Sequence, residues 1–293
     1  MHWKGKEIDW ESAGKRWKKF LKCAEKENRM VHFVGAGPGA ADLITVRGER
    51  LLEEADVIIY AGSLVNPELL SCAKEGAQVH NSARMTLEEV LVVMEEAERA
   101  GKTTVRLHTG DPSLYGAVRE QMDALDEAGI LYDSCPGVSS FCGAASAMNL
   151  EYTLPGVSQS LVITRMEGRT PVPESESIES FAAHRASMAV FLSAGMLPEL
   201  SRRLIAGGYP EDTPAAIVYR ATWEDEKAFV CTVPELAQTA EKNGIHKTAL
   251  ILVGDAVAHS RYERSKLYDP SFSTEYRCAS TEKKTKRRDH DQR

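Results

Sequence analysis

The feature that most constrains the fold is a regular alternation of short apolar runs and amphipathic helical patterns, which begins at residue 30. A strand pattern at 31–34 is followed by a Gly-rich turn and by a helical pattern at 45–55. The strand patterns at 57–60 and 103–108 are also followed by helical patterns. One is expected over 86–100, with Thr86 and Glu89 as a capping box, and another from about Leu114 to Ala128. Such alternation predicts a parallel sheet with right-handed helical crossovers, so we expect an α/β fold.

After residue 156 the pattern changes, because strand-like runs become more frequent than helical ones. These runs lie at 160–165, 188–193, 215–220, 227–232 and 249–253. The short polar segment between the third and fourth runs predicts an antiparallel hairpin. We expect a second α/β domain with a mixed sheet, and we divide the body into an N-terminal domain at 30–156 and a C-terminal domain at 157–258.

Charge and composition exclude several classes of protein. The net charge is −7, but residues 1–29 carry nine Lys or Arg against five Asp or Glu, and residues 276–293 carry seven against three. The body between them is therefore strongly acidic, which argues against a nucleic-acid surface. No apolar run approaches the ~20 residues that cross a bilayer. Six Cys without paired spacing fit a reducing cytoplasm, and eight scattered His predict no metal site.

The two ends of the chain are predicted to differ from the body in structure as well. Trp3, Trp10 and Trp17 recur every seven residues, which predicts an amphipathic N-terminal extension over residues 1–29. A docked or dimer-forming helix is the favoured interpretation, and a membrane-surface helix or an unstructured extension are the alternatives. Residues 259–293 are predicted to form a C-terminal tail that ends in a basic, solvated stretch.

The Gly-rich turn at 35–40 (GAGPGA) matches the dinucleotide-binding pattern GxGxxA, because it follows a strand and precedes a helix. Two features argue against NAD. The second strand ends in YAGS at 60–63, without the carboxylate that holds a ribose. Pro38 also lacks one of the backbone N–H groups that a pyrophosphate uses. A Rossmann-type NAD oxidoreductase is therefore a less favoured function.

Two further turns follow predicted strands. Residues 108–116 (HTGDPSLYG) contain Asp111-Pro112, which taken alone is a common helix start. Ligands of open α/β sheets bind at the edge formed by the carboxyl ends of the strands. A carboxylate beside a glycine at that edge can also accept a hydrogen bond from a ribose hydroxyl or an amino group. Residues 136–141 (PGVSSF) form a third turn of the same type.

These three turns, in this order, resemble those of the tetrapyrrole methyltransferases of cobalamin biosynthesis. The matching segments are VGAGPGAADLIT, ADVIIYAGSLVNPELL, RLHTGDPSLYGA, PGVSSFCGAASAMNLEYTLPG, TRMEGRTPVPE and EDTPAAIVYRATWEDEK. They are spread over residues 30–277, nearly the whole body. YAGSLVNPELL and TRMEGRTPVP resemble in particular the branch of the family that methylates C-11 of precorrin-4 or cobalt-precorrin-4.

The resemblance implies two α/β domains of the tetrapyrrole methylase type, with S-adenosylmethionine (SAM) in the cleft between them, and a cytoplasmic homodimer. It further implies a methyl transfer that converts (cobalt-)precorrin-4 into (cobalt-)precorrin-5 and leaves S-adenosylhomocysteine. The alternative within the family is another tetrapyrrole C-methyltransferase, such as a uroporphyrinogen-III type enzyme. This sequence departs from the family pattern at Ala40-Ala41, Arg84 and Thr274.

The resemblance also implies which residues contact the cofactor, with Asp111 as the polar anchor. Carried over motif by motif, they are Pro38, Gly110, Asp111, Leu114, Ser139, Ser140, Leu192 and Ala221. The physical requirement agrees with this set, because an adenosine needs close backbone approach, and hence small residues, together with one or two hydrogen-bond anchors.

The implied substrate carries several carboxylates, for which Arg side chains are suited because they form paired hydrogen bonds. The candidates are Arg106, Arg119, Arg165, Arg169 and Arg220. Arg165 and Arg169 are favoured because they flank a loop that could cover a cleft. Methyl transfer from a sulfonium mainly requires the alignment of two bound molecules. We therefore assign no catalytic residue, although Asp111, Tyr115 and Glu167 are candidates for removing a proton.

Overall fold

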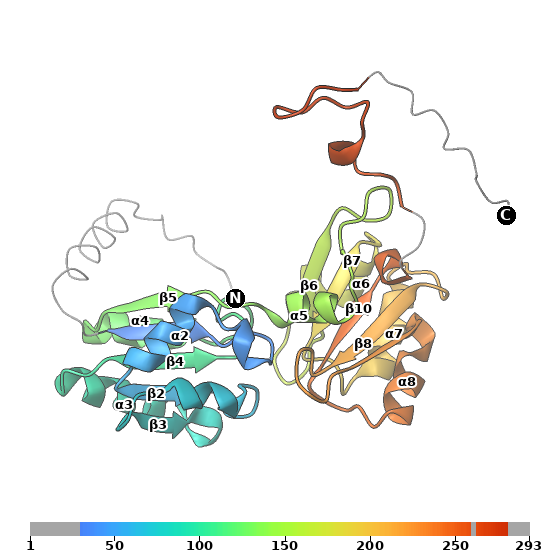
Figure 1. Cartoon of the computed structure of the whole chain (residues 1–293). Helices are drawn as coiled ribbons and strands as arrows, with labels where there is room; N and C mark the ends of the chain where they lie inside the picture. Colours follow the sequence, from blue (N-terminus) through green and yellow to red (C-terminus); the bar gives the residue numbers. More distant parts are fainter. Residues whose placement is uncertain (1–29, 259–261, 281–293) are drawn as a thin grey trace, which may run out of the picture. The chain divides into compact units, whose positions relative to one another are not determined.

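The computed structural model describes residues 30–258 and 262–280, and these form two compact units (Figure 1). The first unit contains the described residues up to Met148 together with Val218–Ala228. The second contains Asn149–Ile217 and the described residues from Phe229 onward. One segment from later in the sequence thus joins the first unit.

Parts of the predicted ends lie outside the described residues. These parts are the whole extension at 1–29 and, within the predicted tail, residues 259–261 and 281–293. Within the described part of the chain, no helix is both long enough and apolar enough to span a bilayer.

The first unit is built on a five-stranded sheet with the strand order β3-β2-β4-β1-β5. Its strands are β1 (Val31–Gly35), β2 (Val57–Tyr60), β3 (Gln78–Asn81), β4 (Thr104–His108) and β5 (Tyr132–Cys135). All neighbouring strands run parallel, which confirms the predicted parallel sheet. β3 was not expected, because its sequence QVHN offers no apolar run and it lies exposed at the edge of the sheet.

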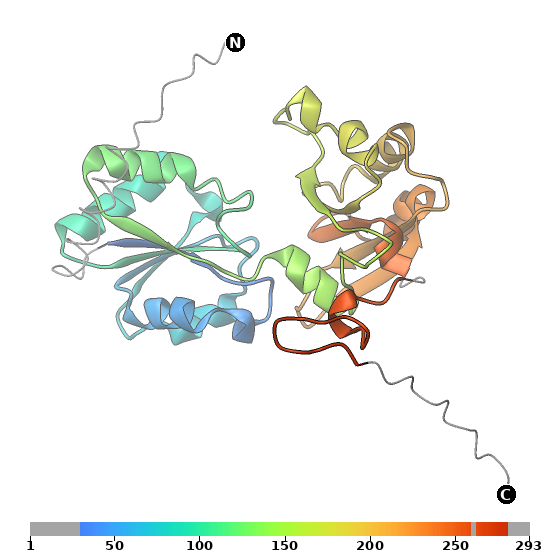
Figure 2. The same ribbon diagram turned by 90° about the horizontal axis from the view of Figure 1, so that it is seen from above.

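Helices α2 (Val46–Glu54), α3 (Leu87–Arg99) and α4 (Arg119–Ala128) cover the two faces of this sheet (Figure 2), and a further helix, α5 (Ser140–Ala147), follows β5. Side chains of a strand alternate between the two faces. Ile58 accordingly packs with Leu52 on the α2 face, whereas Ile59 packs with Met94 and Leu125 on the face of α3 and α4. Each of these side chains is fully buried, which contributes about 2 kcal/mol apiece to folding.

The two helices on the second face begin differently. α3 starts at a capping box, in which Glu89 N donates to Thr86 Oγ1 and Thr86 N donates to Glu89 Oε2 at 2.8 Å, as the sequence predicts. α4 starts at Arg119, although the pattern predicts a start near Leu114. Tyr115 and Ala117 have positive φ angles of 55° and 49°, which a right-handed helix excludes. Residues 112–118 therefore form an irregular turn instead.

The second unit contains a five-stranded sheet with the order β6-β7-β10-β8-β9. Its elements are β6 (Leu161–Arg165), α6 (Ile178–Ala182), β7 (Ser187–Phe191), α7 (Leu197–Ala206), β8 (Pro214–Tyr219), β9 (Lys227–Thr232), α8 (Leu236–Lys242) and β10 (Ala249–Val253). β6 and β7 run parallel, whereas β7 and β10 run antiparallel, so the predicted mixed sheet is confirmed. Met188, Leu200, Leu204 and Ile251 are fully buried in this unit.

Candidate active site

The first unit brings the three predicted turns together at one edge of its sheet. β4, β1 and β5 are neighbours and run parallel, so their carboxyl ends meet at the same edge. The turns that follow them are residues 36–40 after β1, 109–118 after β4 and 136–139 after β5. We call this edge, with its three turns, the turn edge. Ligands of open α/β sheets bind at such an edge.

Backbone contacts hold the three turns against one another. Gly110 N donates to Gly37 O at 2.8 Å, and Gly37 N donates to Gly110 O at 3.3 Å. A Cβ atom on Gly35 would lie 2.5 Å from Gly137 Cα, so any side chain there would force the first and third turns apart. Glycine is therefore required at Gly35 by close approach of backbone.

Asp111 joins the second turn to the third. Its Oδ2 accepts a hydrogen bond from Gly137 N at 2.9 Å, and its Oδ1 accepts from Ser113 N at 2.8 Å and from the Ser113 hydroxyl. Partial burial acts to raise the pKa of Asp111, but the hydrogen bonds from Ser113 and Gly137 outweigh it and hold the pKa below its ordinary value. The turn edge therefore carries one ionised carboxylate at neutral pH.

Leu114, Ser139 and Ser140 belong to the second turn or contact it. Leu114 N donates to Asp111 O at 3.2 Å within the second turn. Ser139 is the N-cap residue of α5, and a Cβ atom on Gly110 would lie 3.5 Å from both Ser139 Cα and Ser140 N. The start of α5 is thus packed directly on the second turn.

Residues 220–226, which the fold assigns to the first unit, contact the Gly-rich turn. Trp223 Nε1 donates to Pro38 O at 3.2 Å, and Ala40 N donates to Thr222 Oγ1 at 3.0 Å. A Cβ atom on Gly39 would lie 2.8 Å from Ala221 O, so Ala221 also lies beside this turn. Apart from Leu192, all residues of the predicted cofactor set therefore belong to the first unit and line its three turns or the segment that contacts them.

Leu192 belongs to the second unit, directly after β7. Its side chain is 65% exposed and its φ angle is 54°. A left-handed conformation costs a residue with a side chain about 1–2 kcal/mol, so it persists only where surrounding structure or function maintains it.

Arg106 lies in the interior of the first unit, where it bonds to other protein groups. The side chain is buried within the first unit, where Nε donates to Gln121 Oε1 and Nη1 donates to Ile59 O, both at 3.1 Å. Burial lowers the pKa of Arg106 to about 10. Because its guanidinium is occupied by protein acceptors in the core, the prediction that Arg106 binds substrate loses its support.

Arg165 organises the loop that follows β6. Its guanidinium donates to the carbonyls of Met166 (3.0 Å), Thr170 (3.2 Å) and Pro171 (3.0 Å), so it holds residues 166–171 in a closed turn. Arg165 thus shapes this loop through backbone acceptors, rather than presenting an unoccupied fork as the sequence suggested.

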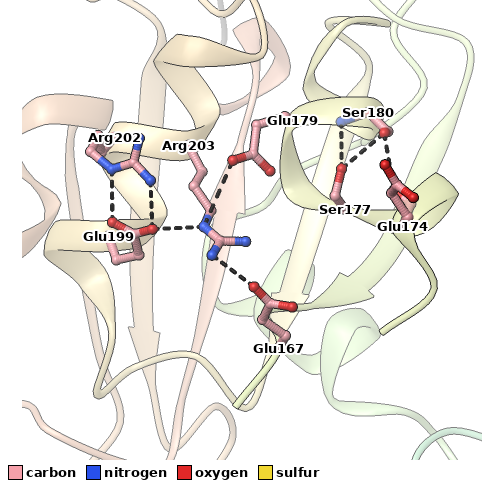
Figure 3. Close-up of polar contacts among 8 residues, drawn as sticks. All are labelled: Glu167, Glu174, Ser177, Glu179, Ser180, Glu199, Arg202 and Arg203. Carbon is pink, nitrogen blue, oxygen red and sulfur yellow. Dashed lines mark hydrogen bonds and ion pairs between the residues drawn. The ribbon is translucent and has the colours of Figure 1, made fainter. Parts of the chain in front are cut away.

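Arg203 of α7 also binds this loop, through Glu167 (Figure 3). It binds Glu167 of the loop at 2.8 Å, Glu199 at 2.8 Å and Glu179 of α6 at 3.7 Å. Hydrogen bonds from Arg202 and Arg203 lower the pKa of Glu199 to about 2, and the partners of Arg203 raise its pKa. Glu167, a candidate proton acceptor, is thereby committed to an ion pair.

The other three candidate arginines lie nearer to solvent. Arg169 is exposed in the 166–171 loop. Arg220 lies over the Trp223 ring, with Cζ 4.2 Å from the ring centroid, and its Nη1 pairs with Asp225 Oδ2 at 2.7 Å. Arg119 pairs with Asp123 and Asp126, which occupies that candidate as well.

His108 was not singled out by the sequence pattern. It ends β4, is 5% exposed and lies against Phe33 at a ring-centroid distance of 6.3 Å. Within the described residues, its Nε2 has no hydrogen-bond partner. Burial, with a smaller contribution from the charge of Arg106, lowers the pKa of His108 to about 3, so the ring is neutral at physiological pH.

A cavity of about 560 Å³ adjoins the Gly-rich turn within the first unit. It is lined by the residues after the turn, by the start of the short 3-10 helix Pro67–Cys72 and by the 220–226 segment. Its charged lining residues are Asp42, Glu68, Arg220, Glu224 and Asp225, so its overall charge is negative. Among the described residues, no cluster of His, Cys, Asp and Glu suits a metal ion.

Comparison with known proteins agrees with this geometry. A family model described as tetrapyrrole (corrin/porphyrin) methylases matches residues 30–237. The chain is 52% identical over 250 residues to the cobalt-precorrin-4 C(11)-methyltransferase of Methanocaldococcus jannaschii, which covers 85% of this chain and 96% of that protein.

Two solved structures show the same fold. One is an X-ray structure of a cobalt precorrin-4 methyltransferase, with a TM-score of 0.76 and 46% identity, covering 78% of this chain and 95% of that one. The other is uroporphyrin-III C-methyltransferase from Thermus thermophilus with S-adenosylhomocysteine, with a TM-score of 0.67 and 27% identity, covering 79% and 100%. Fold and site thus define a two-domain α/β methylase. The chain belongs to the tetrapyrrole (corrin/porphyrin) methylases.

Proposed function

We propose that this chain is a SAM-dependent methyltransferase of cobalamin biosynthesis, which methylates C-11 of precorrin-4 in its metal-free or its cobalt-containing form. The products are then the corresponding precorrin-5 and S-adenosylhomocysteine. The observation that carries the proposal is the set of three turns at one sheet edge, in a chain 46–52% identical to cobalt-precorrin-4 methyltransferases over nearly their whole length. A uroporphyrinogen-III type activity is the second candidate, supported by a more distant likeness of 27% identity.

The turn edge has the chemistry that SAM requires. Its first turn, residues 36–40, consists of Ala, Gly and Pro and so permits close approach of an adenosine, and Asp111 adds an ionised carboxylate that suits a ribose hydroxyl or the positive charge of the cofactor. Both Asp111 oxygens already accept hydrogen bonds, but a carboxylate offers about four lone-pair sites, so further donors can bind. We assign the cofactor contacts to Pro38, Gly110, Asp111, Leu114, Ser139, Ser140, Ala221 and Leu192.

Bound SAM would supply a methyl group that is already activated by its sulfonium. The protein therefore has to hold two molecules in line and keep water away, and it needs no nucleophile of its own. The contacts between Gly37 and Gly110, and between Asp111 and Gly137, support this role because they fix the turns relative to one another. A site fixed in advance loses little freedom when its ligands bind.

The carboxylates of the tetrapyrrole require cations. We assign this role to Arg169 and Arg220, and we assign Arg165 the role of shaping the loop that carries Arg169. Arg169 is exposed, and Arg220 is held in one orientation by the Trp223 ring and Asp225. We further propose that the enzyme is a cytoplasmic homodimer, which sedimentation of the purified full chain tests.

Cofactor binding is the most direct check on the class of activity. Isothermal titration of the purified chain with S-adenosylhomocysteine should give saturable binding with one site per chain. NADH serves as the comparison ligand and should give no heat of binding. A chain that binds NADH, and neither SAM nor S-adenosylhomocysteine, would overturn the proposal.

A further inference from the structure

The turn at 38–40 has little support of its own. Pro38 has no N–H, and Gly39 has neither a side chain nor the conformational restriction that one imposes. Instead, Pro38 O accepts from Trp223 Nε1 at 3.2 Å and Gly39 O accepts from the Asn66 side-chain amide at 3.1 Å. Ala40 N donates to Thr222 Oγ1 at 3.0 Å. Side chains from two distant segments therefore hold the backbone of the turn.

The segment that provides Trp223 and Thr222 is itself rigidly built. Trp223 N donates to Arg220 O at 3.0 Å, and Thr222 N donates to Glu226 Oε2 at 2.5 Å. Arg220 and Thr222 have positive φ angles of 46° and 69°, a strained conformation for residues with side chains that requires such support. The stacking of Arg220 on the Trp223 ring also fixes the orientation of that ring.

Packing restricts the turn further. A Cβ atom on Gly39 would lie 2.5 Å from Trp223 Nε1, and a Cβ atom on Gly143 of α5 would lie 2.7 Å from Pro38 Cβ. Pro38 therefore lies between α5 and the Trp223 segment, and a side chain at either glycine would displace the turn.

We propose that Trp223 and Thr222 are positioning residues, which clamp the 38–40 turn into its cofactor-binding shape before SAM arrives. This inference rests on the proposed function, which assigns Pro38 to the cofactor site. A clamp of this kind lowers the loss of conformational freedom on binding, so it strengthens cofactor binding without contact with the reacting atoms. Its loss should therefore raise the KM for SAM and leave kcat at saturating SAM unchanged.

The test uses substitutions that remove one hydrogen bond with little change of shape. Trp223→Phe removes the N–H donor to Pro38, and Thr222→Val removes the hydroxyl that accepts from Ala40. Each should raise the KM for SAM and the Kd for S-adenosylhomocysteine about threefold to tenfold, the range that a single net hydrogen bond supports. The KM for the tetrapyrrole should not change in Thr222→Val, and Thr222→Ser, which retains the hydroxyl, should show wild-type cofactor binding.

Thr86→Val is the matched control. Thr86 Oγ1 also accepts a backbone N–H, from Glu89, but at the start of α3. This variant should lower the Tm and leave the Kd for S-adenosylhomocysteine unchanged. If Trp223→Phe and Thr222→Val likewise lower only the Tm, their role is structural and the inference is overturned. Should Trp223→Phe fail to fold by circular dichroism, the comparison of Thr222→Val with Thr222→Ser decides.

The same titrations separate this inference from the proposed function. A wild-type chain that binds no S-adenosylhomocysteine contradicts the proposed function itself. A wild-type chain that binds it, together with folded Trp223 and Thr222 variants that bind it equally well, contradicts the clamp alone.

Discussion

Asp111 shows how one side chain can serve both the fold and the site. Its two oxygens accept hydrogen bonds from different turns, so the carboxylate fixes the second and third turns relative to each other. The sequence offers a helix N-cap as the simpler interpretation of Asp111-Pro112, but α4 begins only at Arg119. The carboxylate thus joins turns rather than starting a helix, which a local sequence pattern could not reveal.

Replacement of Asp111 by Asn should weaken both stability and cofactor binding. Asn has only one acceptor oxygen in place of two. If its NH2 group faces Gly137 N, two donors meet and clash; if it faces Ser113, the hydrogen bonds from Ser113 are lost. At pH 7 we expect the free energy of unfolding to fall by about 1 kcal/mol and the Kd for S-adenosylhomocysteine to rise about tenfold. Denaturant titration and calorimetry measure the two effects. Unchanged cofactor affinity in the folded variant would remove Asp111 from the cofactor site.

His108 should make the protein sensitive to mild acid. Its pKa is about 3 in the folded protein and has an ordinary value of 6.5, so the unfolded chain binds a proton that the folded chain rejects. The contribution of His108 to the free energy of unfolding is therefore at its maximum above pH 6.5. It falls as the pH drops towards 3, by up to about 1.4 kcal/mol per pH unit. His108→Phe should flatten the decline of the unfolding free energy between pH 6.5 and 5. Equal slopes in wild type and variant would contradict this.

Arg169 should act on the substrate and not on the cofactor. Arg169→Ala removes an exposed cation, so we expect the KM for the tetrapyrrole to rise about tenfold, as for loss of one charge-assisted hydrogen bond. The KM for SAM should stay constant, and Arg169→Lys should recover part of the loss. Arg202→Ala, at an exposed residue of α7 that pairs with Glu199, is the control and should leave both KM values unchanged. Equal effects of the two Ala variants would contradict the role.

At the scale of elements, the sequence predicted regular structure well where periodicity and capping agree. The capping box at Thr86, the strands 227–232 and 249–253, and the helix after Thr45 all lie where expected. The failures have local physical causes. β3 is a short polar edge strand whose ladder depends on β2, and the late start of α4 depends on positive φ angles at Tyr115 and Ala117. Neither feature produces a periodic pattern of apolar residues in the sequence.

Two arginine side chains hold the loop that follows β6. Arg165 binds three of its carbonyls, and Arg203 binds its Glu167. Lys keeps the charge but cannot reproduce the planar fork, so Arg165→Lys should loosen the loop. We expect at least tenfold faster amide hydrogen exchange over residues 166–171, and unchanged exchange in β10, as measured by mass spectrometry. Unaltered exchange in the loop would show that Arg203 suffices to hold it.

At the scale of the whole molecule, the candidate site depends on contacts that join distant parts of the sequence. Resemblance placed Pro38 and Ala221 in the same site, and the structure supplies the physical reason, since Trp223 and Thr222 bind the turn of Pro38 from more than 180 residues away. Sequence spacing alone could not find this clamp, because nothing local marks Trp223 as a partner of the turn. Sequence spacing also could not distinguish the buried Arg106 from the exposed Arg169 as a candidate for substrate binding.

Methyl transfer from SAM to C-11 of precorrin-4 can be observed in a single reaction. The purified full chain is incubated with SAM and with metal-free or cobalt-containing precorrin-4, and the new methyl is then assigned by mass spectrometry and NMR. We predict a mass gain of one methyl in at least one of the two forms, with the methyl on C-11 and S-adenosylhomocysteine formed in equal amount. Methylation at another carbon, or of uroporphyrinogen III instead, would contradict the account.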